Sequence, residues 1–387
     1  MLYLSLLISK LEKIKFVYLS SEDPRNKKVW SGTHYSIYNA LKSFGEVIII
    51  GPYEPKIRIF ISKILNQFYL KFLNKRISYR HSKFISLGYA NYFNKKLNKL
   101  EFDYIIAPAA SSEIAYINTN KPIIYITDGT FASCLGYHKS LSNLTEKSII
   151  EGNQIEGLAI NKSKIVIVSS KWAANSVISD YHKLPENVKI IPYGANFDII
   201  PNSDELIFQI PKTWKLFFVG VYWENKGGEI AYNTFKELIE KGYDVELTIL
   251  GCTPPEKYNH PKIKIIPFID KNSSEGQAQM KEIYKQQHFL ILPTRFDCTP
   301  IVINEASAFG IPSLVANSGG VEGHLKNNEN GFLLPYNDKG SGYALKIMEL
   351  IDNPDSYLKL RSKTRKLFEN QLNWQHWGKE FKKIINS

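Results

Sequence analysis

The most constraining feature of the sequence is an alternation of short apolar runs with longer segments of helical periodicity. The apolar runs end in small or turn-forming residues. This alternation is typical of a parallel sheet whose strands are joined by crossover helices. In the first half of the chain, the expected strands are 15–19, 47–50, 104–107, 123–126 and 165–168, with 190–191 as a candidate sixth.

The same rhythm restarts in the second half of the chain. Between the halves, Pro201-Asn202-Ser203-Asp204 and Pro211 interrupt the pattern. A chain of 387 residues is longer than one hydrophobic core usually organises. We therefore expect an α/β protein with two doubly wound parallel-sheet domains, 1–205 and 206–370, and a C-terminal helix at 371–387 that packs back on the first. The expected strands of the second half are 216–219, 246–250, 263–266, 289–292, 313–316 and 331–334.

The cysteines and the first residues bear on location. Cys134, Cys252 and Cys298 are widely separated and form no CxxC pair, which favours a reducing compartment. Residues 1–13 open with an apolar run that is too short to span a bilayer and lacks the flanks of a secretion signal. We interpret them as a start-site extension or a short surface segment, with a membrane anchor as the alternative. The expected location is the cytoplasm.

Positive charge is concentrated in one segment. Residues 55–100 contain eleven Lys or Arg and no Asp or Glu, in a chain of net charge +12. Aromatic residues are interleaved with these cations, as in helices that lie on an anionic membrane. A solvated basic face backed by an aromatic core remains the alternative. Nucleic acid is not expected as a partner, because no recognised nucleic-acid motif accompanies the segment.

A glycine-containing loop follows the expected strand 216–219. It runs from Gly220 to Gly228 and leads into a helical pattern at 231–239. The free N–H groups and the dipole of a helix start attract phosphate, and Lys226 adds a full positive charge. The loop is neither a GxGxxG fingerprint nor a Walker loop. It predicts a diphosphate site, and a solvated lysine beside a helix-start glycine is the simpler alternative.

A second polar segment follows the expected strand 289–292. Asp297 and Glu305 lie eight positions apart, and a helix is expected to begin between them. A carboxylate accepts two hydroxyl hydrogen bonds well, so Glu305 suits a ribose diol and Asp297 suits a transferred sugar. The backbone N–H groups of Cys298 and Thr299 suit phosphate oxygens. Spacing alone favours surface charges or a helix cap.

In their order along the chain, these motifs resemble glycosyltransferase family 4, of the group 1 type. The resemblance implies a GT-B fold, in which two Rossmann-like domains face a central cleft. It covers most of the chain. The elements that carry it are Ser31-Gly32-Thr33, 169–174, 191–196, Phe218-Val219-Gly220, Lys226-Gly227, Asp297 with 305–312, Gly319-Gly320 and Asn330-Gly331.

The resemblance also implies how the donor, a nucleotide-diphosphate sugar, is bound. Lys226 and the backbone from Cys298 to Pro300 contact the diphosphate, and Glu305 binds the ribose. Family members generally retain the anomeric configuration and need no metal, because protein cations and helix dipoles stabilise the leaving diphosphate. No further cofactor is implied. The expected donor-site residues are Gly32, Thr33, Gly220, Lys226, Arg295, Cys298, Thr299, Pro300 and Glu305.

The sequence departs from the family pattern at two positions. Asp297 replaces the usual first glutamate and is one methylene shorter. Val221 replaces a common arginine, which removes one cation from the diphosphate site. Arg295 is a candidate to compensate for that loss, and a surface role for it is equally compatible with the sequence. These departures leave room for an inactive homologue.

The acceptor side offers two candidate catalytic residues beside Asp297. Asp128 follows the expected strand 123–126, where a carboxylate can position the acceptor hydroxyl or take its proton. A turn aspartate that caps its own loop is the alternative. His138 is the second candidate, although a lone histidine is more often a surface or core hydrogen-bonding residue.

Together, these features predict a retaining, hexosyltransferase-like enzyme. Its donor would be a UDP- or GDP-linked sugar, and its acceptor a hydroxyl of a glycan or a lipid-linked glycan in cell-surface polysaccharide or glycolipid synthesis. The basic segment would place it at the inner face of the cell membrane. Two alternatives remain open: a sugar-nucleotide epimerase of the same fold, and a non-catalytic nucleotide-binding partner subunit.

Overall fold

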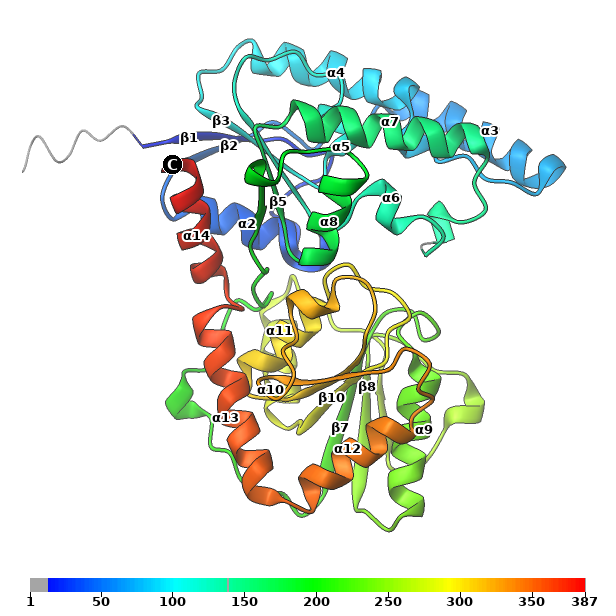
Figure 1. Cartoon of the computed structure of the whole chain (residues 1–387), viewed down its shortest axis with the longest axis vertical. Coiled ribbons are helices and arrows are strands. Elements are labelled where there is room, and N and C mark those ends of the chain that lie inside the picture. Colours follow the sequence, from blue (N-terminus) through cyan, green and yellow to red (C-terminus); the bar gives the residue numbers. More distant parts are fainter. Residues whose placement is uncertain (1–12, 138, 387) are drawn as a thin grey trace, which may run out of the picture. The chain divides into compact units, whose positions relative to one another are not determined.

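The structure is a computed structural model that describes residues 13–137 and 139–386 (Figure 1). The chain divides into two compact units. The first holds the residues up to Val29, His34–Val168 and Ala174–Lys189. The second holds Trp30–Thr33, Ser169–Ala173 and the chain from Ile190 onward. The domain boundary at 205 and the packing of 371–387 stay predictions.

The first unit contains a six-stranded sheet. Its strands follow the order β2-β1-β3-β4-β5-β6. Phe16 lies opposite Val47 on one side and Tyr104 on the other, both in parallel register. The strands are almost continuously apolar because a parallel sheet is buried on both faces. Their bounds are β1 Lys15–Tyr18, β2 Glu46–Ile49, β3 Tyr104–Pro108, β4 Ile123–Thr127, β5 Ile165–Val168 and β6 Val188–Ile190.

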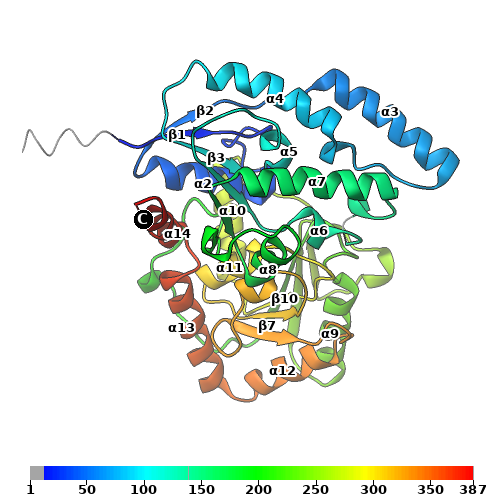
Figure 2. The same cartoon turned by 45° about the horizontal axis from the view of Figure 1, so that its top comes forward.

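Helices of the first unit begin at side-chain caps. The hydroxyl of Ser82 accepts a hydrogen bond from the Ile85 N–H, and that of Thr145 accepts one from the Ser148 N–H. Helix α4 packs against both α3 and α7 (Figure 2). The helices are α2 Thr33–Lys42, α3 Lys56–Leu73, α4 Lys83–Leu97, α5 Ser111–Ile114, α6 Phe131–Cys134, α7 Glu146–Lys162 and α8 Lys171–Ser179, with 3-10 turns η1 Val29–Gly32, η2 Tyr79–His81, η3 Lys139–Leu141 and η4 Pro185–Asn187.

The second unit contains another six-stranded sheet, of order β12-β11-β10-β7-β8-β9. The chain builds outward from β7 in one direction, then returns to add β10 on its other side. This reversal creates a topological switch point between β7 and β10, where doubly wound sheets bind ligands. The strands are β7 Trp214–Val219, β8 Val245–Leu250, β9 Ile263–Ile266, β10 Phe289–Leu292, β11 Ser313–Ala316 and β12 Gly331–Leu334.

Two apolar cores cover the two faces of this second sheet. Phe217 and Phe218 are neighbours in β7 but belong to different cores, because successive side chains of a strand point to opposite faces. Helix α9 packs against α12, and α11 packs against α13. The helices are α9 Gly228–Glu240, α10 Ser274–Lys285, α11 Ile301–Ala308, α12 Ser341–Ile351, α13 Pro354–Asn370 and α14 Trp374–Asn386, with 3-10 turns η5 Ser203–Glu205, η6 Glu256–Tyr258 and η7 Val321–Gly323.

All twelve strands expected from the sequence are confirmed, with ends that agree to within a residue or two. The parallel α/β class is confirmed as well. None of the helices within 13–137 and 139–386 combines the length and the apolar character that crossing a bilayer requires. Residues 1–12, and with them almost all of the segment interpreted above as a start-site extension or surface segment, lie outside the described part of the chain.

Candidate functional site

The two polar segments meet at the switch point of the second sheet. The loop after β7 begins at Gly220, and the loop after β10 begins at Pro293. Hydrogen bonds join them, because the Asn225 carbonyl accepts from the Arg295 N–H at 2.8 Å and from the Thr294 hydroxyl at 3.3 Å. Residues 69 or more positions apart in the sequence thus share one end of the sheet.

Lys226 and Asp297 form an ion pair across these loops. Their side chains are 26% and 13% exposed, so solvent reaches the pair. Gly220 makes room for the lysine, because a Cβ there would lie 2.6 Å from Cγ of Lys226. At Gly227, φ is +73° and a Cβ would lie 2.1 Å from the Pro293 carbonyl oxygen. The glycines therefore allow the lysine to lie against the end of β7.

The loop Ser318-Gly319-Gly320 supports the backbone of the acidic segment. The Gly320 N–H donates to the Asp297 carbonyl at 2.9 Å. A Cβ on Gly319 would lie 2.3 Å from that oxygen, and a Cβ on Gly320 would lie 2.0 Å from the Cys298 carbonyl oxygen. Such close approach between two backbone segments requires glycine. The link between these two motifs is thus direct backbone contact.

Glu305 lies in the second turn of α11, which begins directly after Pro300. Its side chain is only 3% exposed. The Tyr284 hydroxyl donates to Oε2 at 2.8 Å, and Nζ of Lys271 lies 3.1 Å from Oε1. A buried carboxylate is tolerated when such donors satisfy its oxygens. The helix start expected between Asp297 and Glu305 is confirmed.

Lys271 and Tyr284 are partners of Glu305 that sequence reasoning missed. Lys271 follows β9, and its position after a strand was a usable signal. Tyr284 lies on α10 and is completely buried, so in the sequence it looks like an ordinary core residue. Burial and the charge of Glu305 raise the pKa of Tyr284 well above its usual value. Its hydroxyl therefore remains a hydrogen-bond donor.

Thr299 and Pro300 lie between these two acids and are buried. The Thr299 hydroxyl lies 2.5 Å from the Ser169 hydroxyl. Cys298 is half-buried. The chain path from Asp297 into α11 is thus fixed by side-chain and backbone contacts on both sides. Its role toward phosphate stays a prediction.

The loop that contains Gly32 and Thr33 groups with the second unit. The Asn196 side-chain amide donates to the Ser31 carbonyl at 2.9 Å and lies 3.3 Å from the Thr33 hydroxyl. Ser31 has φ +55° and Gly32 has φ +94°, so the loop is left-handed. Non-glycine residues in that region are uncommon and often mark functional loops.

The acceptor-side candidates belong to the first unit. Asp128 is half-buried in the turn after β4. His138 lies outside the described residues. Nearby in sequence, Tyr125 donates its hydroxyl to Oε1 of Glu156 at 2.9 Å. Burial raises the pKa of Glu156 to about 7, so this carboxyl titrates near neutral pH.

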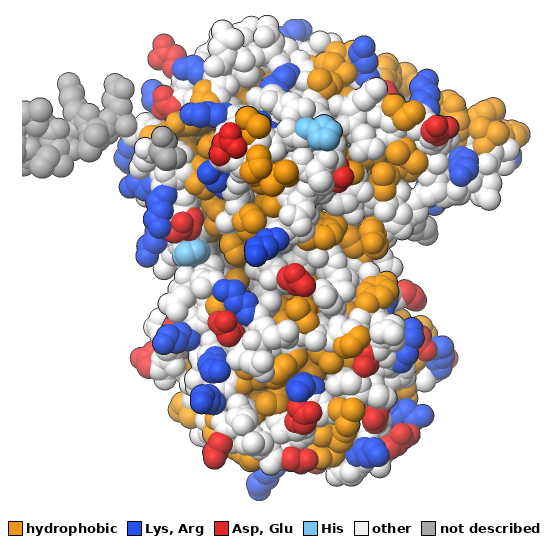
Figure 3. Space-filling view, in the orientation of Figure 1, with side chains coloured by type: hydrophobic (Ala, Val, Ile, Leu, Met, Phe, Trp, Pro, Cys, Tyr) orange, Lys and Arg blue, Asp and Glu red, His pale blue; other side chains and the backbone are white. Residues whose placement is uncertain are grey.

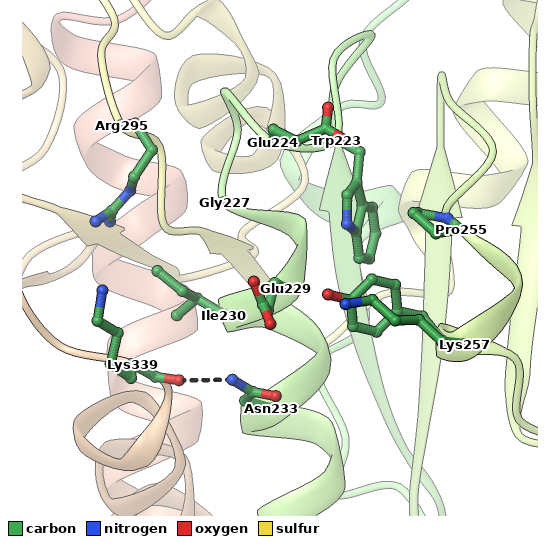
Figure 4. Close-up of a pocket in the computed structure, with 11 residues that line it drawn as sticks. Trp223, Glu224, Gly227, Glu229, Ile230, Asn233, Pro255, Lys257, Arg295 and Lys339 are labelled. Atoms are coloured by element: carbon green, nitrogen blue, oxygen red, sulfur yellow. Dashed lines mark hydrogen bonds between the residues drawn. The ribbon is translucent and has the colours of Figure 1, made fainter.

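Arg295 faces a different cavity. Its guanidinium donates to the carbonyls of Pro293 and Tyr336 at 3.0 and 2.7 Å, and it stacks 4.4 Å from the ring centre of Tyr336. It lines a pocket of about 590 Å³. Arg295 and Lys339 lie on one side of that pocket and Trp223, Pro255 and Lys257 on the other, with Glu229 between them (Figure 4).

Lys226, Asp297 and Glu305 do not line this pocket. Its charged lining is mixed, with Glu224 and Glu229 beside Lys257, Arg295 and Lys339. Lys226 and Asp297 instead pair across the loops that follow β7 and β10. We therefore place the candidate site at the switch point rather than in the pocket. Compensation for Val221 by Arg295 stays a prediction.

Among residues 13–137 and 139–386, no group of three or more His, Cys, Asp or Glu side chains is arranged to hold a metal ion. The protein cations near the two loops include Lys226, Lys271 and Arg295. Independence of metal stays a prediction.

Comparison with known sequences relates the second unit to a family. Residues 213–353 match the family described as glycosyl transferases group 1. The D-inositol 3-phosphate glycosyltransferase of Corynebacterium aurimucosum is 22% identical over 250 residues, which cover 60% of this chain and 58% of that protein. The chain thus spans somewhat more than half the length of this relative. The narrower assignment to family 4 stays a prediction.

Solved structures resemble the chain over nearly all its length. Sucrose-phosphate synthase from Thermosynechococcus elongatus has a TM-score of 0.69 at 14% identity and covers 97% of this chain and 98% of its own. Anabaena HepE, solved in complex with UDP and glucose, has a TM-score of 0.65 at 13% identity and covers 96% and 99%. The predicted GT-B fold is confirmed.

Proposed function

We propose that this protein is a glycosyltransferase that moves a sugar from a nucleotide diphosphate to an acceptor hydroxyl. The observation that carries the proposal is the pairing of Lys226 with Asp297 at the switch point of the second sheet, close in sequence to the buried Glu305. These residues fall within the segment that matches group 1 glycosyl transferases. The arrangement provides a cation for phosphate and two carboxylates for hydroxyl groups.

Glu305 is assigned to the ribose of the donor. A carboxylate offers about four lone-pair sites, and Tyr284 and Lys271 occupy two of them. The remaining sites can accept the two hydroxyl hydrogens of a ribose diol. Lys271 also brings a positive charge beside Glu305.

Lys226 is assigned to the donor diphosphate and Asp297 to the transferred sugar. Negative charge develops on the departing phosphate in the transition state, and a cation already in place stabilises it without reorganisation. The start of α11 adds the positive end of a helix dipole behind Cys298 and Thr299. These protein charges support a reaction without metal, and the retained anomeric configuration is proposed from the resemblance to family 4.

Asp128 is assigned to the acceptor hydroxyl, and the loop of Gly32 and Thr33 to the donor phosphates. UDP is favoured as the nucleotide by the structural neighbour that was solved with UDP and glucose. The acceptor we propose is a glycan or a lipid-linked glycan, modified in the cytoplasm at the membrane during cell-surface polysaccharide or glycolipid synthesis.

A thermal-shift screen with UDP, GDP, ADP and their sugars tests the proposal. A ligand that binds only the folded state raises the apparent stability. Lys226→Ala should abolish the shift, whereas Lys257→Ala, in the pocket of about 590 Å³, should preserve it. The opposite result would move the nucleotide to the pocket. The absence of any shift with the wild type would contradict donor binding altogether.

Transfer is then measured with the donor that binds, over a panel of acceptors, with and without EDTA. We expect release of the nucleotide diphosphate only when an acceptor is present, at equal rates in both conditions. Epimer formation without an acceptor would instead identify an epimerase. Binding without any turnover would indicate a nucleotide-binding partner subunit, which the shortened Asp297 and the missing arginine at Val221 make worth testing.

A further inference from the structure

Helix α3 carries a stripe of exposed large hydrophobic side chains. Ile57 is 78% exposed, Phe60 65%, Phe68 53% and Phe72 63%. Soluble proteins rarely expose contiguous apolar surface of this kind without a partner. Figure 3 shows hydrophobic side chains gathered over this helix, with Lys and Arg among them. The full stripe consists of Ile57, Phe60, Ile61, Ile64, Leu65, Phe68 and Phe72, and we call it the α3 stripe.

The α3 stripe lies on one face of the helix. Residues 57, 61, 64, 68 and 72 follow the spacing that aligns side chains along an α-helix. Ile59 and Ser62 lie on the opposite face and are buried against the first unit. The helix therefore packs through its narrower and more polar side and presents its apolar side outward.

The neighbouring helix α4 behaves in the ordinary way. Its residues Tyr89 and Phe93 are 3% and 0% exposed. Tyr92 stacks on Tyr53 with ring centres 3.8 Å apart. Three of the four aromatic residues of α4 are thus buried or half-buried, and the fourth, Phe84, is 44% exposed. A basic face backed by an aromatic core, one interpretation of segment 55–100, therefore describes most of α4 but not α3.

Positive charge flanks the α3 stripe. Lys56, Lys63 and Lys71 are exposed on α3, and Lys75 follows its end. Segment 55–100 contributes no carboxylate to offset them. Arg58 is engaged within the protein, because it donates to the Phe84 carbonyl at 2.5 Å and stacks over the Phe84 ring. The lysines, by contrast, are exposed, and the ammonium group of Lys71 lies 5.7 Å from the ring centre of Phe72.

We propose that α3 docks the first unit on an anionic lipid bilayer. The α3 stripe lies at the boundary between headgroups and acyl chains, and its lysines contact headgroup phosphates. Charge selects this occupant, since a second copy of the chain would bring two rows of lysines together. The surface is independent of sugar transfer, so failure of the proposed enzymatic function leaves this inference intact.

Co-sedimentation of the full chain with vesicles tests the docking. The vesicles contain phosphatidylcholine alone or phosphatidylcholine with about one third phosphatidylglycerol. We expect binding to the anionic vesicles only. Phe60→Ser combined with Phe68→Ser should weaken binding about tenfold or more, because two rings leave the interface. Ile207→Ser with Leu345→Ser removes side chains that are 76% and 56% exposed elsewhere and serves as the matched control.

The electrostatic part is tested by charge reversal. Lys63→Glu with Lys71→Glu should weaken binding at least about tenfold, and raised salt should do the same to the wild type. Lys359→Glu with Lys366→Glu makes an equal change of charge at exposed positions of α13 and should bind as the wild type does. If both charge-reversal variants lost vesicle binding equally, the effect would come from net charge alone, and the assignment to α3 would be overturned.

Three further results would overturn the proposal. Unchanged binding by the phenylalanine variant would place the membrane contact elsewhere, for instance in residues 1–12. Equal binding to neutral vesicles would remove the role of the lysines. In a third outcome, the wild type does not bind vesicles and is dimeric by analytical ultracentrifugation, whereas the phenylalanine variant is monomeric. That outcome would identify the α3 stripe as a contact between copies of the chain. A thermal unfolding curve like that of the wild type confirms that each variant is folded.

Discussion

The Tyr284 hydroxyl donates a hydrogen bond of 2.8 Å to Oε2 of Glu305 inside the second unit. Both residues are buried, and they come from different helices, α10 and α11. The bond holds the carboxylate in one orientation, and Lys271 contacts the other oxygen. A binding group fixed in this way does not have to be ordered when its ligand arrives.

Tyr284→Phe should lower both stability and nucleotide affinity. Oε2 of Glu305 would lose its donor in a buried environment, which costs about 1–3 kcal/mol. Denaturant unfolding and calorimetric titration with the nucleotide measure the two effects. Tyr343→Phe is the control, because the buried hydroxyl of Tyr343 has no hydrogen-bond partner among the described residues. Equal losses of unfolding free energy in both variants would mean that the hydrogen bond to Glu305 does not contribute to stability.

Val221→Arg should strengthen donor binding. The side chain of Val221 is 70% exposed directly after Gly220, so an arginine fits there without disturbing the core. A new hydrogen-bonded cation at the diphosphate should raise affinity on the order of tenfold. Tyr222→Arg places the same charge at the next position, which is 65% exposed. Equal gains from both variants would mean general electrostatic attraction rather than a specific contact.

Gly320→Ala should disrupt the acidic segment. The added Cβ would lie 2.0 Å from the Cys298 carbonyl oxygen, so the backbone near Asp297 must move. We expect a loss of about 1–3 kcal/mol in the free energy of unfolding and a larger loss of nucleotide affinity. Gly157→Ala is the control, since its Cβ would meet only ordinary contact at 3.4 Å from Tyr181. Unchanged nucleotide affinity in Gly320→Ala would contradict the supporting role of this loop.

Glu156→Gln should change how stability depends on pH. Burial raises the pKa of Glu156 from 4.5 to about 7. Its stabilising contribution is therefore complete below about pH 4.5 and is lost as pH rises through 7. We compare the free energy of unfolding of the variant with that of the wild type at each pH. The difference, variant minus wild type, should be larger at about pH 8 than at about pH 5, by on the order of 3 kcal/mol.

Groups that titrate alike in the variant and the wild type cancel in the difference between their free energies of unfolding. Burial lowers the pKa of His34 and of His81 to about 4, which destabilises both proteins equally in acid. Glu186→Gln, an exposed change in the same unit, is the control and should track the wild type at every pH. A constant difference between Glu156→Gln and the wild type across this range would show that Glu156 is not protonated in the folded protein near neutrality.

The candidate site was largely predictable where it depends on strands. The strands 216–219 and 289–292 were evident as apolar runs, and Lys226 and Asp297 follow them in the sequence. Parallel strands place their carboxyl ends at one edge of a sheet, so residues after such strands converge. Sheet order was needed to see that β7 and β10 are adjacent.

By itself, the sequence determined the two α/β units, the twelve strands and the residues that follow them. These depend on periodicity and turn chemistry within short segments. Only the tertiary structure decided that Tyr284 and Lys271 hold Glu305, and that α3 presents outward the kind of side chains that α4 mostly buries. The two helices share their composition of aromatic and basic residues. Which face each one buries depends on packing against distant parts of the chain, and local periodicity does not encode that choice.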